Sequence, residues 1–171
     1  MTPDSTIYYV WIGGSCDYGH KERAGGAAVV IERMEQREQS QTCLNSAESR
    51  QKKTKCQHNG SIIRRDVISD LHTPEFRMML TLMVKVMQEL EPGSDILFLT
   101  NSAYIQNFDK APTAKSANLD LILQCIEEKK SHNSVGVKIV QYHKSPLLIE
   151  THDMATEAMT KTRKDYHHEL K

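Results

Sequence analysis

Long apolar runs are absent from the sequence, and their absence argues against a membrane-spanning protein. No stretch of the 171 residues approaches the roughly 18 consecutive apolar residues that a transmembrane helix needs. The opening residues, MTPDSTIYYVW, also contain no basic segment followed by a long apolar one, which a secretory signal peptide requires. The sequence therefore predicts a cytoplasmic location and no membrane partner.

An excess of either charge is absent as well. Lys and Arg together number 22, and so do Asp and Glu, so the whole chain gives no electrostatic reason to expect tight binding to nucleic acid. Any basic contact surface must be local. One concentrated basic stretch is the candidate for nucleic-acid contact, although such runs commonly form a solvated face: Arg50, Lys52, Lys53, Lys55, Arg64 and Arg65.

Cysteine pairs at redox or metal-site spacing are also missing. The four cysteines, Cys16, Cys43, Cys56 and Cys125, include no C-x-x-C pair. Cys43 and Cys56 have no zinc-finger spacing to His58. In a chain without an export signal, reduced thiols are expected rather than disulfides.

The sequence does contain enough apolar residues, 39% of the total, to build one core of ordinary size. We therefore expect a single domain over residues 1–171. Residues 7–12 and 25–31 indicate two strands of a hairpin, and Gly13 with Gly14 is interpreted as a tight turn that ends the first strand. Residues 33–60 contain almost no apolar side chains and are expected to form a flexible insertion.

Strands and helices alternate in the rest of the chain. Residues 61–69, 96–99 and 135–142 have strand character, and residues 75–91, 118–130 and 150–162 have helical spacing of their apolar side chains. The first of these helices has Thr73 as its expected N-cap, and the charged tail from 161 to 171 is expected to fray. This order predicts an α/β fold with a mixed sheet whose later strands are parallel.

Three short motifs carry a resemblance to a known family. They are VWIGGSC at residues 10–16, TPEFRMM at 73–79 and TNSAYI at 100–105. Over nearly all of residues 6–160 the sequence resembles the type 1 ribonuclease H family. The resemblance implies a ribonuclease H-like fold, with three antiparallel strands followed by parallel strands in a five-stranded mixed sheet, and helices on both faces.

The acidic residues of the family site are missing from these motifs. Gly13, Met78 and Asn101 stand where the family carries an aspartate, a glutamate and an aspartate. Without the resemblance, Met78 would be interpreted as filling the core or lining an apolar pocket. Asn101 at a strand end would be interpreted as a cap or turn residue that bonds nearby amides.

The fourth acidic position can be aligned in two ways. His143 matches the histidine of the family's loop, and counting from it without gaps places Asp153 at the acidic position. Matching the apolar phase of the following helix places His152 there instead, and we prefer this alignment because side-chain direction constrains the position more than loop length does. His143 and His152 could bind Zn²⁺ or titrate near neutral pH, but two histidines without a third ligand are more simply polar surface groups.

These replacements bear on metal binding. In the family, four carboxylates hold two Mg²⁺ ions that activate a water for attack on an RNA phosphodiester. Two dications about 4 Å apart repel by about 17 kcal/mol at an effective dielectric of about 20, which neutral side chains cannot offset. We therefore expect no stable two-metal site and no cofactor. A relocated site would draw on Glu75, Asp17 and Asp153, with Mg²⁺ or Mn²⁺ as its metal.

The sequence leaves several functional hypotheses. The first is a degenerate ribonuclease H-like domain without hydrolase activity, which binds an RNA/DNA hybrid or other nucleic acid or acts as a scaffold for a protein partner. The second is an active metal-dependent endonuclease that cleaves RNA in RNA/DNA hybrids with the relocated ligands, or that uses His143 and His152 as acid and base. The third is an unrelated α/β binding protein.

Overall fold

Three antiparallel strands form one half of the sheet. The computed structural model describes residues 6–16, 23–34, 60–106 and 118–169. Strand β1 (Ile7–Cys16) pairs with β2 (Ala24–Met34), and β2 pairs with β3 (Gly60–Leu71), both in antiparallel register. Alternation along β1 buries Tyr8, Val10 and Ile12 on one face of the sheet, as the two-residue period of a strand requires.

Two parallel strands complete the sheet. Strand β4 (Asp95–Thr100) lies parallel to β1, and β5 (Ser134–Ile139) lies parallel to β4. The strand order is β3-β2-β1-β4-β5, so the predicted α/β fold with three antiparallel strands followed by parallel strands is confirmed. Because β1 and β4 are parallel, their carboxyl ends meet at the same edge of the sheet.

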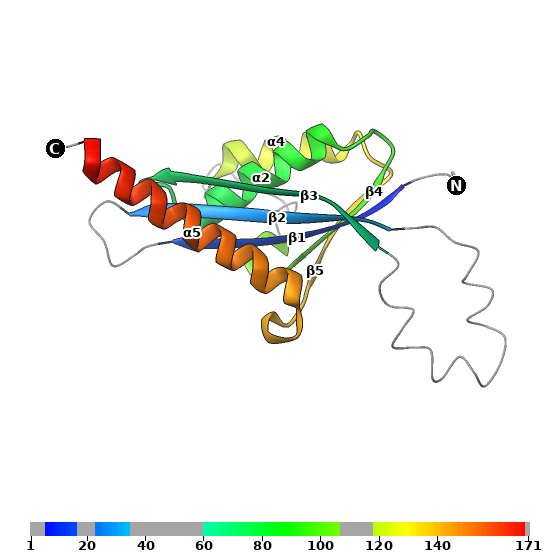
Figure 1. Ribbon diagram of the computed structural model, residues 1–171. Coiled ribbons are helices and arrows are strands. Elements are labelled where there is room, and N and C mark those ends of the chain that lie inside the picture. Colours follow the sequence, from blue (N-terminus) through cyan, green and yellow to red (C-terminus); the bar gives the residue numbers. More distant parts are fainter. Residues whose placement is uncertain (1–5, 17–22, 35–59, 107–117, 170–171) are drawn as a thin grey trace.

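Helices cover both faces of the sheet (Figure 1). Helices α2 (Glu75–Glu89) and α4 (Leu119–Lys129) pack together on one face, while α5 (Pro146–Glu169) crosses β1, β2 and β3 on the other. The short helix α3 (Ala103–Gln106) follows β4, and a 3-10 turn, η3 (Tyr142–Lys144), leads into α5. This layering encloses the main core between the sheet and α2.

The prediction of a tight turn at Gly13 and Gly14 is wrong. Both glycines belong to β1, where Gly13 pairs with Ala28 and Gly14 with Ala27. Glycine is needed here because helices pack closely over this end of the sheet, and not because the chain turns. At Gly26, on the neighbouring strand, an added Cβ would lie 2.6 Å from the carbonyl oxygen of Ala155 on α5.

Two helix boundaries also differ from the predictions. The N-cap of α2 is Pro74 and not Thr73, because the Thr73 hydroxyl donates to the Leu71 carbonyl at 3.0 Å instead. Helix α5 starts earlier and ends later than residues 150–162, since proline is well suited to a first helical position and Leu148 is already buried there. Residues 161–169, expected to fray, are helical. No described helix, α5 included, is long and apolar enough to cross a membrane.

The core is built from one helix face and the central strands. Leu80, Met83 and Met87 of α2 are essentially fully buried, and so is Phe98 of β4. Cys125 of α4 closes the cluster, with its thiol 3.8 Å from the Leu80 carbonyl oxygen. Burial raises the pKa of this thiol to about 12, so it stays protonated at neutral pH. Cys16 and Cys125, the described cysteines, are free thiols.

Candidate functional site

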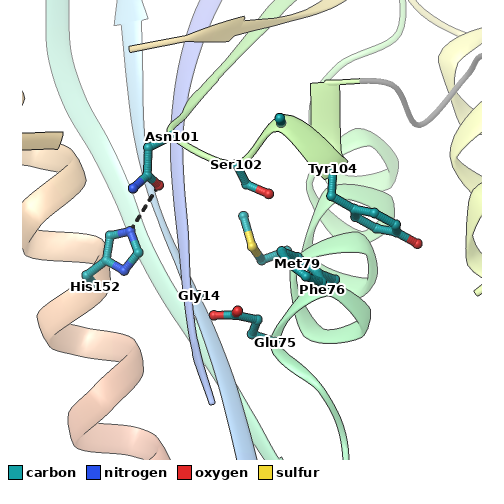
Figure 2. A pocket seen from close by; sticks show the side chains of 9 residues that line it. Gly14, Glu75, Phe76, Met79, Asn101, Ser102, Tyr104 and His152 are labelled. Atoms are coloured by element: carbon teal, nitrogen blue, oxygen red, sulfur yellow. Dashed lines mark hydrogen bonds between the residues drawn. The ribbon is translucent and has the colours of Figure 1, made fainter. Parts of the chain in front are cut away.

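A pocket lies where β1 and β4 end, beside the first turn of α2 (Figure 2). It encloses about 410 Å³. We call it the strand-end pocket and define it by the residues that line it: Gly14, Glu75, Phe76, Met79, Asn101, Ser102, Ala103, Tyr104 and His152. Binding sites of α/β sheets gather beyond the carboxyl ends of the strands, so this pocket is the candidate functional site.

Two of the predicted site positions are brought together in the pocket. His152 on α5 lies with its Nε2 atom 3.3 Å from Oδ1 of Asn101, which directly follows β4. The Tyr142 ring packs edge-on against the His152 ring at a centroid distance of 4.9 Å, which further restricts the imidazole. Asp153, the alternative to His152, is exposed on α5 and is not among the pocket residues.

His152 is a neutral group at neutral pH. Burial lowers the pKa of its imidazole, and it outweighs the opposing effects of a hydrogen bond to the Gly14 backbone and of the nearby Asp153 charge. A neutral imidazole and an amide carry no net charge. The wall formed by Asn101 and His152 is therefore polar without being anionic.

Gly13 leaves no room for a side chain while α5 stays in place. An added Cβ would overlap the Thr151 hydroxyl and would lie 2.9 Å from Cδ2 of His152. Thr151 is fully buried, and its hydroxyl donates to the Leu148 carbonyl at 2.6 Å. Moving this side chain would therefore break that hydrogen bond. An aspartate at residue 13 is therefore incompatible with the observed positions of Thr151 and His152.

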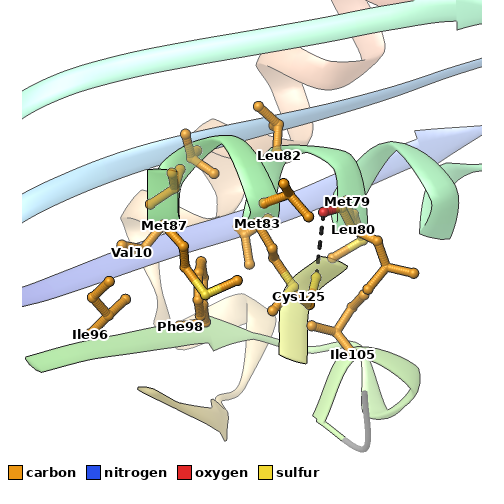
Figure 3. Packing of buried hydrophobic residues seen from close by; sticks show 14 of the residues in the cluster. Val10, Met79, Leu80, Leu82, Met83, Met87, Ile96, Phe98, Ile105 and Cys125 are labelled. Atoms are coloured by element: carbon orange, nitrogen blue, oxygen red, sulfur yellow. Dashed lines mark hydrogen bonds between the residues drawn. The ribbon is translucent and has the colours of Figure 1, made fainter. Parts of the chain in front are cut away.

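Met78 does not line the pocket. Its side chain is buried in the core with 8% exposure. The neighbouring residue, Met79, lines the pocket instead, together with Gly14 of β1. Met83, one helical turn beyond Met79, continues this row into the core (Figure 3). The interpretation of Met78 as a core residue agrees with this burial.

Aromatic rings and one carboxylate form the opposite wall. The rings of Phe76 on α2 and Tyr104 on α3 lie 4.7 Å apart at an angle of 31°. The Tyr104 hydroxyl accepts a hydrogen bond from the Asn118 side chain at 3.0 Å, which holds its ring in place. Glu75, a weak candidate from the sequence, does line the pocket in the first turn of α2, where the helix dipole favours its negative charge.

The other candidate ligands do not join Glu75. His143 is exposed in η3 and packs edge-on against the Tyr142 ring, with a centroid distance of 5.3 Å. Asp17 lies outside the described residues. Within the described ranges, no group of three or more His, Cys, Asp or Glu side chains is placed to hold a metal ion.

Two members of the candidate basic stretch, Arg64 and Arg65, lie within the described residues. Arg64 and Arg65 point to opposite faces of β3, where Arg64 pairs with Glu89 of α2 at 2.5 Å and Arg65 pairs with Glu150 of α5 at 3.1 Å. Each charge is thus matched by a carboxylate. The remaining members, Arg50, Lys52, Lys53 and Lys55, lie outside the described residues, as does most of the insertion expected at 33–60.

Several pocket residues are not among the predicted site residues, namely Gly14, Phe76, Met79, Ser102, Ala103 and Tyr104. Part of the signal was present in the sequence. Glu75 and Met79 are four residues apart on a helix, so a pocket at one of them includes the other. The pairing of Phe76 with Tyr104 had no such signal, because it depends on how α3 packs against α2.

Comparison with known proteins identifies the fold. No protein-family model matches the chain, and no curated protein matches it. The solved structure of LC9-RNase H1, described as a type 1 RNase H with the type 2 active-site motif, has 18% sequence identity and a TM-score of 0.67, covering 92% of this chain and 74% of that chain.

Two further structures agree. The N-terminal RNase H domain of Rv2228c from Mycobacterium tuberculosis, solved as a fusion with maltose binding protein, is 9% identical with a TM-score of 0.61, covering 95% of this chain and 99% of that chain. RNase H1 from the halophilic archaeon Halobacterium salinarum NRC-1 is 13% identical with a TM-score of 0.55, covering 91% and 98%. The chain therefore has a ribonuclease H-like fold.

Adding a methyl group at Gly13 tests the close contact with α5. We expect Gly13→Ala to lower the free energy of unfolding by about 1–3 kcal/mol, because the new Cβ overlaps Thr151. In the background of Thr151→Ala the same change should cost clearly less, which urea denaturation of the four proteins in a double-mutant cycle would measure. Additive losses would contradict the contact.

The buried imidazole predicts a pH effect on stability. The pKa of His152 in the folded protein lies below its ordinary value of 6.5, so the unfolded chain takes up a proton first on acidification. Stability from this group is complete above about pH 6.5 and falls as the pH drops toward the folded pKa. NMR titration of the ring should show the low pKa, and His152→Gln should reduce the pH dependence of unfolding; a ring that titrates above 6.5 would refute it.

Proposed function

We propose that this ribonuclease H-like domain binds a protein partner and does not hydrolyse RNA. The observation that carries the proposal is the composition of the strand-end pocket. Its described lining holds a neutral pair, Asn101 and His152, a thioether from Met79, and the carboxylate of Glu75 as its one acidic group. Such a site can recognise a ligand, but it offers little to bind a pair of metal ions.

The charge balance argues against two-metal chemistry. Glu75 supplies one negative charge, whereas two divalent ions bring four positive charges that repel each other at the separation hydrolysis requires. The Asn101 carbonyl oxygen is a possible ligand for a hard cation, but a neutral oxygen competes poorly with the water that Mg²⁺ already holds. The described lining residues therefore do not fit the metal pair.

The packing of α5 strengthens this argument. Thr151 and His152 occupy the space that a side chain at residue 13 would need, so the pocket is closed to an acidic group from that position of β1. A single reversion would not restore the missing charge. The absence of an acid at residue 13 and the close position of α5 thus depend on each other.

The charges of Arg64, Arg65 and the described pocket lining favour a protein over a nucleic acid as the partner. Binding to nucleic acid rests on Lys and Arg side chains that neutralise phosphates. Arg64 and Arg65 are already paired with carboxylates on opposite faces, and the pocket lining contains no Lys or Arg. A cytoplasmic protein partner that docks at the former catalytic cleft is the version of the scaffolding hypothesis that we prefer.

A metal-dependent ribonuclease with relocated ligands is the second candidate. One observation favours it, since Glu75 lines the pocket close to the end of β4 where Asn101 also lies. It would need at least one more carboxylate within reach of the same ion. Asp153 is exposed away from the lining, which leaves this candidate the weaker of the two.

A cleavage assay separates the two candidates. We expect no turnover of an RNA/DNA hybrid with Mg²⁺ or Mn²⁺ above a no-protein control, because the pocket does not assemble paired ions. The assay should include Glu75→Gln and, as a matched control, Glu157→Gln, which removes an exposed carboxylate of α5 outside the pocket. Metal-dependent turnover that disappears in Glu75→Gln and survives in Glu157→Gln would refute the proposal.

A further inference from the structure

Strand β3 forms one edge of the described sheet. It pairs with β2 on one side, so a row of its backbone N–H and C=O groups faces away from the sheet (Figure 1). Two of its apolar side chains are exposed, Ile63 at 48% and Val67 at 38%. An edge strand with exposed β-branched side chains is a site at which another strand can pair.

The direction of the backbone groups follows from the end of the strand. Directly beyond the pair formed by Leu71 and Ala24, the His72 N–H donates to the Arg23 carbonyl oxygen at 2.6 Å and so points toward β2. The register is regular from 64 to 71, and successive residues of an antiparallel strand direct these groups alternately to the two sides. The N–H groups of Leu71 and Val67 therefore point outward.

Both of these outward N–H groups are already bonded. Val67 donates to Oδ1 of Asp66 at 2.9 Å, and Leu71 donates to Oδ1 of Asp70 at 2.8 Å. The other oxygen of Asp66 is held by α2, where Nζ of Lys85 lies 2.8 Å from Oδ2. Each residue has one backbone N–H, so a donor bonded within its own chain is not available to an incoming strand. We call Asp66 and Asp70 the edge caps.

The charges along β3 disfavour most ways of pairing it with a second copy of itself. Two identical antiparallel strands related by a two-fold axis place residues opposite each other at equal distances from a central residue. A register centred on Arg64, Arg65 or Asp66 would bring two like charges together at the axis. A register centred on Ile68 would set Asp66 opposite Asp70.

A register centred on Val67 avoids these repulsions. The two Val67 side chains would meet at the axis, and Arg64 would lie opposite Asp70. Ile63 would lie opposite Leu71, so apolar side chains pair as well. The backbone ladder of this register needs the outward N–H groups of Val67 and Leu71, and these are the two donors that the edge caps occupy.

We propose that the edge of β3 is a self-association surface for a second copy of this chain, and that the edge caps hold it closed. With both caps in place the central donors are occupied, and the chain stays monomeric. Without them, a row of donors flanked by apolar side chains is open, and two copies join their sheets across β3. The strand-end pocket contains no residue of β3, so this inference does not depend on the proposed function.

Sedimentation velocity of the full chain tests the proposal. We expect Asp66→Ala combined with Asp70→Ala to dimerise, with a dissociation constant roughly tenfold or more below that of the parent chain. The matched control is Asp66→Asn combined with Asp70→Asn, which should stay monomeric because the asparagine Oδ1 still accepts the backbone N–H. Adding Val67→Lys to the alanine variant should restore the monomer, since two ammonium groups would meet at the axis.

Amide hydrogen exchange of the parent chain gives a second measurement, which needs no variant. The Val67 N–H, bonded to Asp66, should exchange roughly tenfold or more slowly than the Ser69 N–H, which points outward between the two caps. Equal rates would overturn the role of the caps, even if the alanine variant did not fold.

The sedimentation results can also overturn the inference. An alanine variant that is folded by circular dichroism but remains monomeric would show that the edge does not self-associate. A parent chain that is already dimeric would show that the caps do not keep the chain monomeric. Equal association of the asparagine variant would assign the effect to lost charge instead of lost hydrogen bonds. A dimer that persists with Val67→Lys would exclude the β3 edge as its interface.

Discussion

The contact between α5 and the end of β1 is the constraint on which the site depends. Gly13 has no Cβ, and the helix uses the space to bring Thr151 and His152 against the strand. His152 then reaches Asn101, and the two neutral side chains close one wall of the strand-end pocket. A side chain at residue 13 would push this helix outward, because Thr151 is fully buried and bonded to Leu148.

The fold and the charge of its site are therefore separate properties of this chain. The strand order, the parallel pairing of β1 with β4 and the helices on both faces are those of a ribonuclease H-like fold. Hydrolysis by paired metal ions depends on something else, the summed negative charge at the strand ends. Here the described lining combines one carboxylate with acceptor oxygens, two aromatic rings and a thioether. The described lining thus supplies one negative charge, against the four positive charges of two divalent ions.

Much of the fold could be predicted from the sequence, because it depends on local pattern. The apolar repeat of α2 and the fully apolar stretch of β4 determine their own type, and Pro74 marks the helix start to within a residue. The prediction of a turn at Gly13 and Gly14 was wrong because a glycine pair has the same sequence signal in a turn and in a strand against which a helix packs closely. Only the position of α5, set by tertiary packing, distinguishes the two.

The site could be predicted less well, for the same physical reason. Asn101 and His152 are 51 residues apart, and their contact follows from the crossing of α5 over the sheet. Whether Met78 or Met79 faces the pocket depends on the rotation of α2 by one residue, which an apolar row of methionines does not specify. The pairing of Phe76 with Tyr104 requires the placement of α3 and carries no pattern in the sequence at all.

Anomalous X-ray diffraction from crystals soaked in Mn²⁺ tests the central claim most directly, because it locates metal ions without relying on activity. The account predicts no pair of manganese peaks between Glu75 and Asn101, where the ends of β1 and β4 meet. Two well-occupied peaks about 4 Å apart in that position would contradict it.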